Sequence, residues 1–126
     1  ISCHFIMDSH MQLMHASLTQ PEDCAFVVTH TGVTKEMLAI ARMVKSAGGK
    51  VIVITSYPNA KISEYADVTF VSTSEETGYR SESLSSRYPQ LAIIDSLYTT
   101  LMFRNPNASE SLSRIRTIIS TTKEDH

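Results

Sequence analysis

The sequence predicts an α/β domain with a parallel sheet, because three short apolar runs alternate with segments of helical character. The runs are residues 24–29, Lys50–Thr55 and Val68–Val71. The first two are continuous rather than alternating, which is typical of parallel strands covered on both faces. Strand, helix, strand, helix, strand in this order forms a right-handed series, so we expect the three runs to be neighbours in one sheet.

The segments between these runs predict the helices. Apolar residues recur at helical spacing between residues 35 and 47, and Gly48 with Gly49 would end that helix in a left-handed conformation. The expected buried stripe consists of Met37, Leu38, Ile40, Ala41 and Val44. Earlier in the chain, residues 2–6 are predicted as a strand, and Asp8 is expected to cap a following helix.

The second half of the chain predicts more helix than strand. Residues 62–66 are expected to form a short helical turn, and residues 81–104 have the composition of a long helix. Pro89 lies within it and should kink the helix or mark a late start. A last helix is expected after Asn105-Pro106, with Asn107 or Ser109 at its cap.

Composition limits the classes of function. The chain has 126 residues, enough for one domain, and a formal net charge of −2, which argues against binding nucleic acid by itself. The two cysteines form no CxxC pattern, and the histidines lack metal-ligand spacing, so we expect neither a metal nor a cofactor. No apolar run approaches the roughly 18 residues of a membrane span. We therefore expect a cytoplasmic protein with no membrane contact.

The segment after the first buried run carries the strongest chemical signal. Its residues are Thr29, His30, Thr31, Gly32, Val33 and Thr34. Thr34 would open a helix whose first N–H groups lack partners and, with the helix dipole, attract an anion. Gly32 allows a tight turn, and three threonine hydroxyls surround it. We interpret the segment as a phosphate-binding turn; the alternative is that Thr31 or Thr34 only caps the helix.

The turn does not match the common nucleotide-binding motifs. It is not GxxxxGK[ST], which argues against an NTPase, and it is not GxGxxG, which argues against a dinucleotide site. In parallel sheets ligands lie at the carboxyl ends of strands, so the loops starting at Thr29, Thr55 and Val71 should border the site.

The turn resembles the Ser-x-Ser-Gly-x-Thr signature of SIS (sugar isomerase) domains, with Thr29 and Thr31 in place of the serines. Further stretches are similar to the sensor domain of RpiR-type bacterial transcription regulators, and Arg80-Ser81-Glu82 belongs to the most specific of them. The similar stretches are residues 23–34, 47–49, 51–55, 66–68, 75–77, 80–83, 85–87 and 90–95.

The resemblance implies a flavodoxin-like three-layer sandwich that forms a homodimer and binds a phosphorylated sugar, amino sugar or sugar acid. It also implies that DNA is bound by a helix-turn-helix domain that is not part of this sequence. The family's first strand and its Gly-x-Gly-x-Ser loop do not precede Ser2. We therefore predict that residues 1–126 form an SIS-type phosphosugar-binding domain that lacks the family's first strand and belongs to a longer regulator.

Several other residues have both a functional and a structural interpretation. His30 could contact the ligand or point away from it. Thr55 and Ser56 could contact the sugar or cap the turn that follows them. Glu82 could contact a ligand hydroxyl, shuttle a proton between two sugar carbons, or pair with Arg80 or Arg87.

Three functions remain open at this point. The leading hypothesis is an effector-sensing domain without turnover. An aldose–ketose isomerase acting on sugar phosphates is the alternative, with Glu82 or His30 as its base. A dimerisation module with a vestigial pocket is a third. The identity of the phosphosugar is not determined by the sequence.

Overall fold

The computed structural model describes residues 3–72 and 85–121, which fall into two units, Ile1–Leu91 and Ala92–His126. We describe each unit by itself. In the first unit, the helices are α1 (Ser9–Ser17), α2 (Lys35–Ser46) and the 3₁₀ helix η1 (Lys61–Tyr65). Its strands are β1 (Cys24–Val28), β2 (Lys50–Thr55) and β3 (Val68–Val71).

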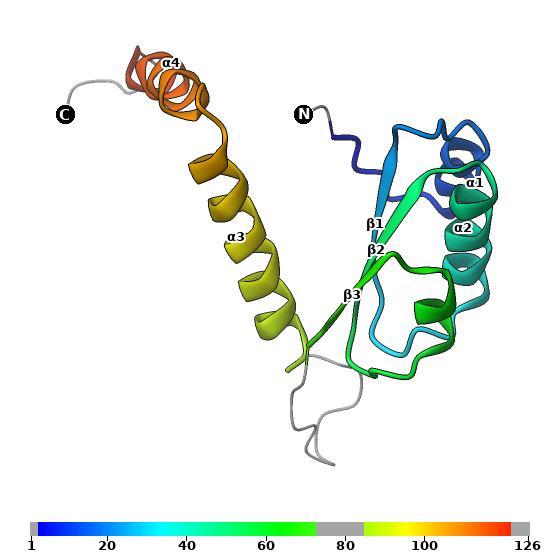
Figure 1. Ribbon diagram of the computed structural model, residues 1–126. Helices are drawn as coiled ribbons and strands as arrows, with labels where there is room; N and C mark the ends of the chain where they lie inside the picture. The colour runs from blue at the N-terminus through cyan, green and yellow to red at the C-terminus, as the bar shows by residue number, and fades with distance from the viewer. Residues whose placement is uncertain (1–2, 73–84, 122–126) are drawn as a thin grey trace. The chain divides into compact units, whose positions relative to one another are not determined.

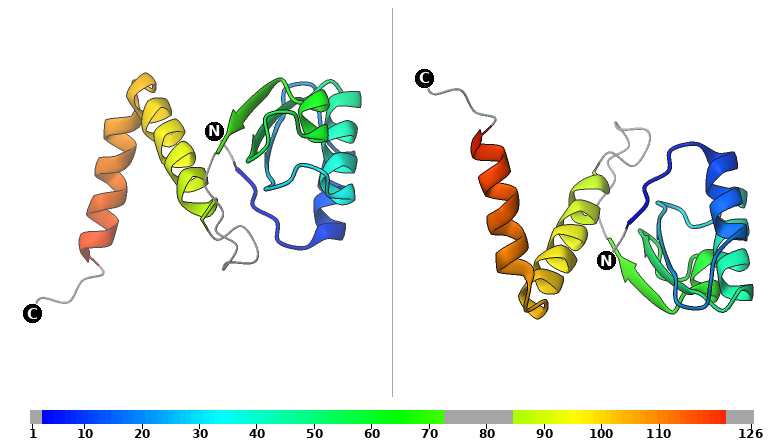
Figure 2. Two further views of the ribbon diagram at one scale, coloured as in Figure 1. Left: turned by 90° about the horizontal axis from the view of Figure 1, so that it is seen from below. Right: turned by 90° about the horizontal axis from the view of Figure 1, so that it is seen from above.

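The three strands form one parallel sheet in the order β1-β2-β3, which confirms the predicted arrangement. Val27 lies opposite Val53, and Ile54 lies opposite Phe70. The helices α1 and α2 and η1 all lie on one side of this sheet (Figure 1, Figure 2). Because the strands are parallel and in register, their carboxyl ends meet at one edge, where the predicted turn begins.

The core of the first unit lies between α2 and the sheet. Ile40, Ala41 and Val44 of the predicted stripe are buried there, and Met37 and Leu38 pack against the same cluster. The sheet and η1 supply the facing side chains. These are Val27, Val51, Val53 and Ile62. Burying each such aliphatic side chain contributes about 1.5–3 kcal/mol, so this layer fixes α2 on the sheet.

The predicted start of α1 and the predicted end of α2 are confirmed. The Asp8 carboxylate accepts a hydrogen bond of 2.9 Å from the Met11 N–H, which caps α1. Beyond α2, Gly48 has a φ of 85°, the left-handed conformation expected of a glycine at this position. The N–H groups of Gly48 and Gly49 then donate to carbonyls of the last turn, those of Lys45 and Val44.

One expectation for the strands is corrected. Of the strand expected at residues 2–6, the described residues 3–6 are not a strand, and in the described part of the chain β1 pairs only with β2. Within the first unit the described helices lie on one face of the sheet, and Val27 is buried while Phe26 and Val28 are about 40% exposed.

The remaining helices are α3 (Arg87–Arg104) and α4 (Ala108–Thr121). The helix α3 begins at Arg87, which is the late start that Pro89 predicted. Pro89 lies in the first turn of α3, where a proline fits because its missing N–H has no intrahelical partner. Residues 81–84, predicted as helix, lie outside the described residues. Asn107 directly precedes α4, as one of the two predicted caps. None of the described helices is long and apolar enough to cross a membrane.

Asp67, which directly precedes β3, bonds to residues at the beginning of β2 and at the end of α2. One carboxylate oxygen lies 2.7 Å from the Lys45 ammonium and 3.4 Å from that of Lys50, and the other accepts from the Val51 N–H at 2.9 Å. The hydrogen bond from Lys45, followed by that from Val51, holds the pKa of Asp67 well below its usual range. The ionised carboxylate therefore stabilises the folded chain.

This arrangement predicts an acid-dependent loss of stability. A carboxylate with a lowered pKa stabilises the fold at pH values above its ordinary pKa of about 3.9, and that contribution is lost as the pH falls below it. Asp67→Asn should lower the urea midpoint near neutral pH and reduce the decline on acidification, both followed by circular dichroism. A pH dependence parallel to that of the original chain would contradict this role.

Candidate functional site

The turn between β1 and α2 is anchored to the neighbouring strand. The Thr29 N–H donates to the Ile54 carbonyl at 2.9 Å, which extends the pairing of β1 and β2 by one residue. The Thr29 side chain is buried, and its hydroxyl oxygen accepts from the Gly32 N–H at 3.3 Å. Thr29 therefore stabilises the conformation of the turn through its backbone and its buried hydroxyl.

Gly32 brings the turn into close contact with η1. Its φ is 65°, and a Cβ on this residue would lie 2.5 Å from the Ala60 Cβ and 3.0 Å from Ile62 Cγ2. The Gly32 carbonyl also accepts from the Ile62 N–H at 3.1 Å. Only glycine combines this conformation with this approach, so the predicted need for a glycine is confirmed and has two causes.

The first turn of α2 has no side-chain cap from its N-cap residue. Thr34 occupies the N-cap position with extended backbone angles, and its carbonyl accepts from the Leu38 N–H at 3.0 Å. Its side chain makes no capping hydrogen bond, so the capping alternative does not hold for Thr34. The N–H groups of the first turn lack intrahelical partners. In the turn that leads into this helix, the side chains of Thr31, Val33 and Thr34 are exposed.

His30 connects the turn to the end of β2. Its carbonyl accepts from the Ser56 N–H at 3.0 Å and from the Thr55 hydroxyl at 2.9 Å. Its ring nitrogen Nδ1 lies 2.8 Å from Ser56 Oγ. The ring also meets Tyr57 edge to face, with centroids 5.6 Å apart. His30 is half-buried, and both its backbone and its ring are held in place.

The structure gives different positions to the other predicted site residues. Thr55 is fully buried, and its hydroxyl also accepts from the Tyr57 N–H at 3.4 Å, as the capping interpretation expected. Ser56 is half-buried beside His30. Glu82 and Arg80 lie outside the described residues. Contacts of Thr55, Ser56 and Glu82 with a sugar therefore stay predictions.

Ser72 is a polar residue of this region that the sequence analysis did not single out. Its side chain is buried, and its hydroxyl lies 3.3 Å from Ser56 Oγ and 3.4 Å from the Thr55 carbonyl. The signal was available, because Ser72 follows β3 just as Ser56 follows β2. Polar residues directly after parallel strands gather at one edge of the sheet.

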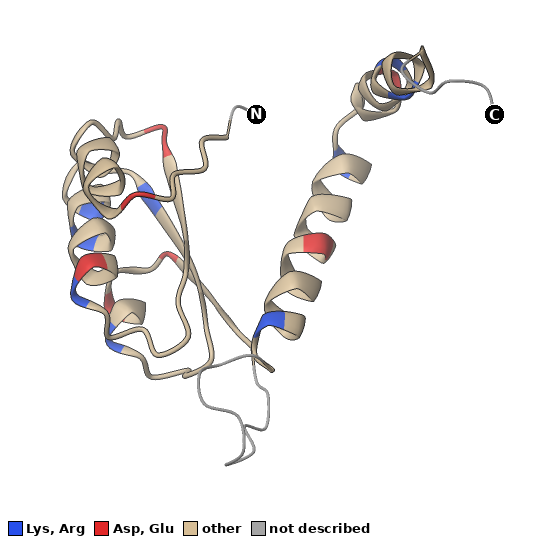
Figure 3. Cartoon of the chain, turned by 180° about the vertical axis from the view of Figure 1, so that it is seen from behind, with Lys and Arg blue, Asp and Glu red and all other residues tan. Residues whose placement is uncertain are grey.

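The turn itself contains no lysine or arginine, but two lysines lie near it in the sequence or the fold. Lys35 follows Thr34 at the start of α2, and Lys61 precedes Ile62 at the start of η1. Both side chains are exposed. Figure 3 shows Lys and Arg along the outer side of α2. An anion at the turn would thus rely on N–H and hydroxyl donors, with the lysines adding a screened attraction.

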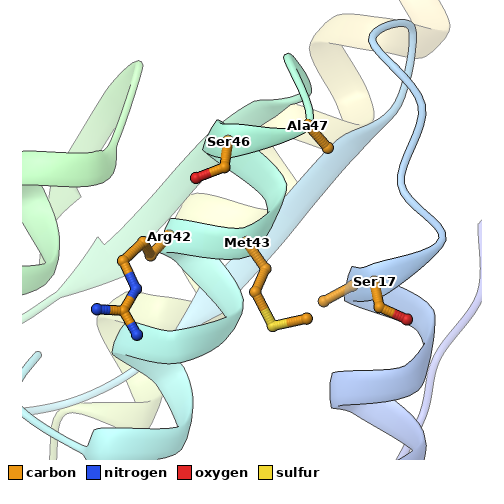
Figure 4. Close-up of a pocket in the computed structure, with 6 residues that line it drawn as sticks. Ser17, Arg42, Met43, Ser46 and Ala47 are labelled. Carbon is orange, nitrogen blue, oxygen red and sulfur yellow. The ribbon is translucent and has the colours of Figure 1, made fainter.

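A surface hollow of about 390 Å³ lies elsewhere, between α1 and the last turns of α2 (Figure 4). Arg42 is its one charged residue. The other lining residues are Ala16, Ser17, Met43, Ser46 and Ala47. It is formed at the opposite end of α2 from the turn, away from the strand ends where parallel sheets bind ligands. The turn remains the candidate site.

A parallel sheet whose first strand leads through a glycine-containing turn into a helix is typical of α/β domains. The family model described as SIS domain matches residues 1–100, and the chain therefore belongs to the SIS domain family. The predicted resemblance is confirmed.

Regulators of transcription are among the relatives. The chain is 31% identical over 122 residues to an uncharacterized HTH-type transcriptional regulator of Thermotoga maritima, covering 97% of this chain and 44% of the relative. It is 33% identical over 101 residues to the HTH-type transcriptional regulator RpiR of Escherichia coli K12, covering 80% of this chain and 34% of the relative. The chain thus spans less than half the length of these relatives.

Two solved structures share the fold. The NanR protein of Vibrio vulnificus, complexed with ManNAc-6P, matches 95% of this chain and 46% of its own with a TM-score of 0.83 and 21% identity. A putative sugar-phosphate isomerase from Listeria monocytogenes matches 85% of this chain and 68% of its own, with a TM-score of 0.68 and 23% identity. These likenesses confirm the predicted SIS-type fold.

The two glycines with positive φ allow a matched test of the packing at the turn. Gly48→Ala should cost about 1–2 kcal/mol, because its φ is unfavourable but a Cβ would meet nothing closer than 3.5 Å. Gly32→Ala should cost more, because its Cβ would also collide with Ala60. Urea unfolding measures both, and equal costs would contradict the close contact at Gly32.

Proposed function

We propose that this chain is the phosphosugar-binding, effector-sensing domain of a bacterial helix-turn-helix transcription regulator, and that residues 1–126 act as one such domain. The observation that carries the proposal is the start of α2, where Thr34 is the N-cap without a side-chain capping hydrogen bond and the side chains of Thr31 and Thr34 in the preceding turn are exposed.

The turn has the donors that a phosphate group needs. Phosphate oxygens accept hydrogen bonds from helix N-terminal N–H groups, and the helix dipole adds to the attraction. The hydroxyls of Thr31 and Thr34 supply further donors. Val33 and Gly32 contribute their backbone, while buried Thr29 holds the turn without facing solvent. In this proposal the residues Thr29, His30, Thr31, Gly32, Val33 and Thr34 form the phosphate site.

The sugar would lie towards the ends of β2 and β3. His30 in the turn and Ser56 after β2 are half-buried polar side chains whose atoms Nδ1 and Oγ lie 2.8 Å apart. Thr55 acts through the backbone of His30, to which its hydroxyl donates. The ManNAc-6P in the similar NanR structure supports a phosphorylated sugar as the class of ligand.

The regulatory role is supported by the names of the relatives, both of them HTH-type transcriptional regulators. A separate DNA-binding domain also agrees with the net charge of −2, which gives this segment no attraction to the phosphate backbone of DNA. In the proposed regulator, which acts in the cytoplasm, a phosphosugar shifts the equilibrium between two arrangements of a dimer and so the placement of its DNA-binding domains.

A homodimer is part of this proposal. The helix α3 carries three charged residues over 18 positions and buries none of its side chains among the described residues. Its apolar side chains include Leu91, Ile94, Tyr98 and Leu101, each at least 40% exposed. A second copy of the chain would cover such a surface.

Phosphosugar binding should depend on the Thr31 hydroxyl. Hydrogen bonds to charged groups contribute about 1.5–3 kcal/mol, so Thr31→Ala should weaken binding by roughly tenfold to a hundredfold. Thr31→Ser keeps the hydroxyl and should bind like the original protein. Calorimetry on the full-length protein, after a thermal-shift screen of phosphosugars, measures this. Equal affinity of the alanine and serine variants would contradict the site.

The sensing role also predicts that the ligand is not converted. The phosphosugar that binds should be recovered unchanged after prolonged incubation with the full-length protein, as followed by proton NMR of the sugar. Sustained formation of the ketose from the aldose, or the reverse, would contradict a pure sensor and support the isomerase.

A further inference from the structure

The loop after β2 meets the turn between β1 and α2 at two points. The ring of Tyr57 lies edge to face with the ring of His30, and their centroids are 5.6 Å apart. Three residues further on, Ala60 lies so close to Gly32 that a Cβ on the glycine would be 2.5 Å from the Ala60 Cβ. Residues 57–60 therefore border the turn, and Tyr57 is the aromatic residue among them.

The backbone of Tyr57 is held in place on both sides. Its N–H donates to the buried Thr55 hydroxyl oxygen at 3.4 Å, and its carbonyl accepts from the Ala60 N–H at 3.1 Å. Pro58 follows, and the residue before a proline is restricted in its backbone angles. The contact with His30 limits the ring on one side. A ligand that contacts Tyr57 therefore immobilises it at a smaller entropic cost than a freely rotating side chain.

Tyr57 is nevertheless 51% exposed, so a large part of this aromatic residue faces solvent beside the turn. Removing apolar surface from water is favourable by about 25 cal/mol per Å². Phosphate gains little from such a surface, because the face of an aromatic ring carries negative electrostatic potential. The faces of a sugar ring carry C–H groups, which pack well against an aromatic side chain. The exposed part of Tyr57 therefore suits the sugar rather than its phosphate.

We propose that Tyr57 is a specificity-determining residue that packs against the closed ring of the phosphosugar, an inference that rests on the proposed function. The phosphate binds at the turn, and the sugar extends from it along the loop after β2. A closed ring presents a rigid C–H surface to Tyr57. An open-chain sugar would have to be ordered on the tyrosine at a cost in conformational entropy, so the cyclic form is favoured.

Calorimetry on the full-length protein tests the inference with three compounds. These are the phosphosugar that binds most tightly in the thermal-shift screen, the open-chain alditol phosphate obtained by reducing it, and inorganic phosphate. Tyr57→Ala should weaken binding of the phosphosugar about tenfold, which corresponds to roughly 50 Å² of apolar surface left in water. The affinity for inorganic phosphate should not change. The original protein should bind the alditol phosphate more weakly than the phosphosugar.

Two further variants identify the part of the side chain that acts. Tyr57→Phe removes the hydroxyl and keeps the ring, so it should restore the affinity that Tyr57→Ala loses. Phe5→Ala is the control for the loss of an exposed aromatic side chain, because Phe5 is 89% exposed and lies before α1 in the sequence. It should leave all three affinities unchanged.

A second measurement does not depend on the folding of the alanine variant. In a protein whose only protonated rings are those of tyrosine, saturation of these ring protons should be transferred to the C–H protons of the bound phosphosugar. The transfer should disappear in Tyr57→Phe, whose ring at this position is deuterated. Transfer that is absent from the original protein, or that persists in Tyr57→Phe, would overturn the inference.

The calorimetric outcomes separate this inference from the proposed function. If binding of the phosphosugar depends on the Thr31 hydroxyl but is the same in Tyr57→Ala, the proposed function stands and the inference is overturned. Equal weakening of the phosphosugar and of inorganic phosphate, or tighter binding of the alditol phosphate than of the phosphosugar, also overturns it. If no phosphosugar binds, both are overturned.

Discussion

The contact of Gly32 with η1 is the constraint on which the candidate site depends. The missing Cβ lets the turn lie against Ala60 and Ile62, and the Gly32 carbonyl accepts from the Ile62 N–H. This contact, with the Thr29 hydroxyl beneath it, sets the direction in which the chain enters α2. A side chain at residue 32 would push the turn away from η1 and tilt the first N–H groups of the helix. The geometry of the proposed anion site is therefore set by packing.

The site is also shared among three strands. Parallel pairing in register brings the ends of β1, β2 and β3 to one edge of the sheet, where Thr29, Ser56 and Ser72 follow them. One polar group after each strand is enough to build a connected network, because the strands lie about 5 Å apart. His30 is held by the group after β2, and that group is held by the one after β3. Loss of the pairing between β2 and β3 would therefore change the position of Ser72, of Ser56 and so of His30 in the turn.

Much of the first unit could be predicted because its signals are local. The stripe of α2 follows from helical spacing, the cap at Asp8 from a carboxylate next to free N–H groups, and the turn at Gly48 from the left-handed conformation that glycine tolerates. Of the strand expected at residues 2–6, the prediction was wrong for the described residues 3–6, because a strand needs a neighbour, which is a property of the sheet and not of the run. Ser72 was missed although it follows β3 just as Ser56 follows β2, and its burial and its contacts with Ser56 and Thr55 became visible only in the folded chain.

By itself, the sequence determined that this chain is an α/β domain of SIS type, and it predicted a phosphate site at the turn from Thr29 to Thr34. It could do so because helical spacing, the position of a glycine and the order of strands and helices are all local features of the sequence. Only the tertiary structure decided which hydroxyls hold the scaffold and which face outwards. Thr29 and Thr55 are buried and bonded to backbone, whereas Thr31 and Thr34 are exposed. Four threonines with the same chemistry differ in role because packing removes two of them from solvent.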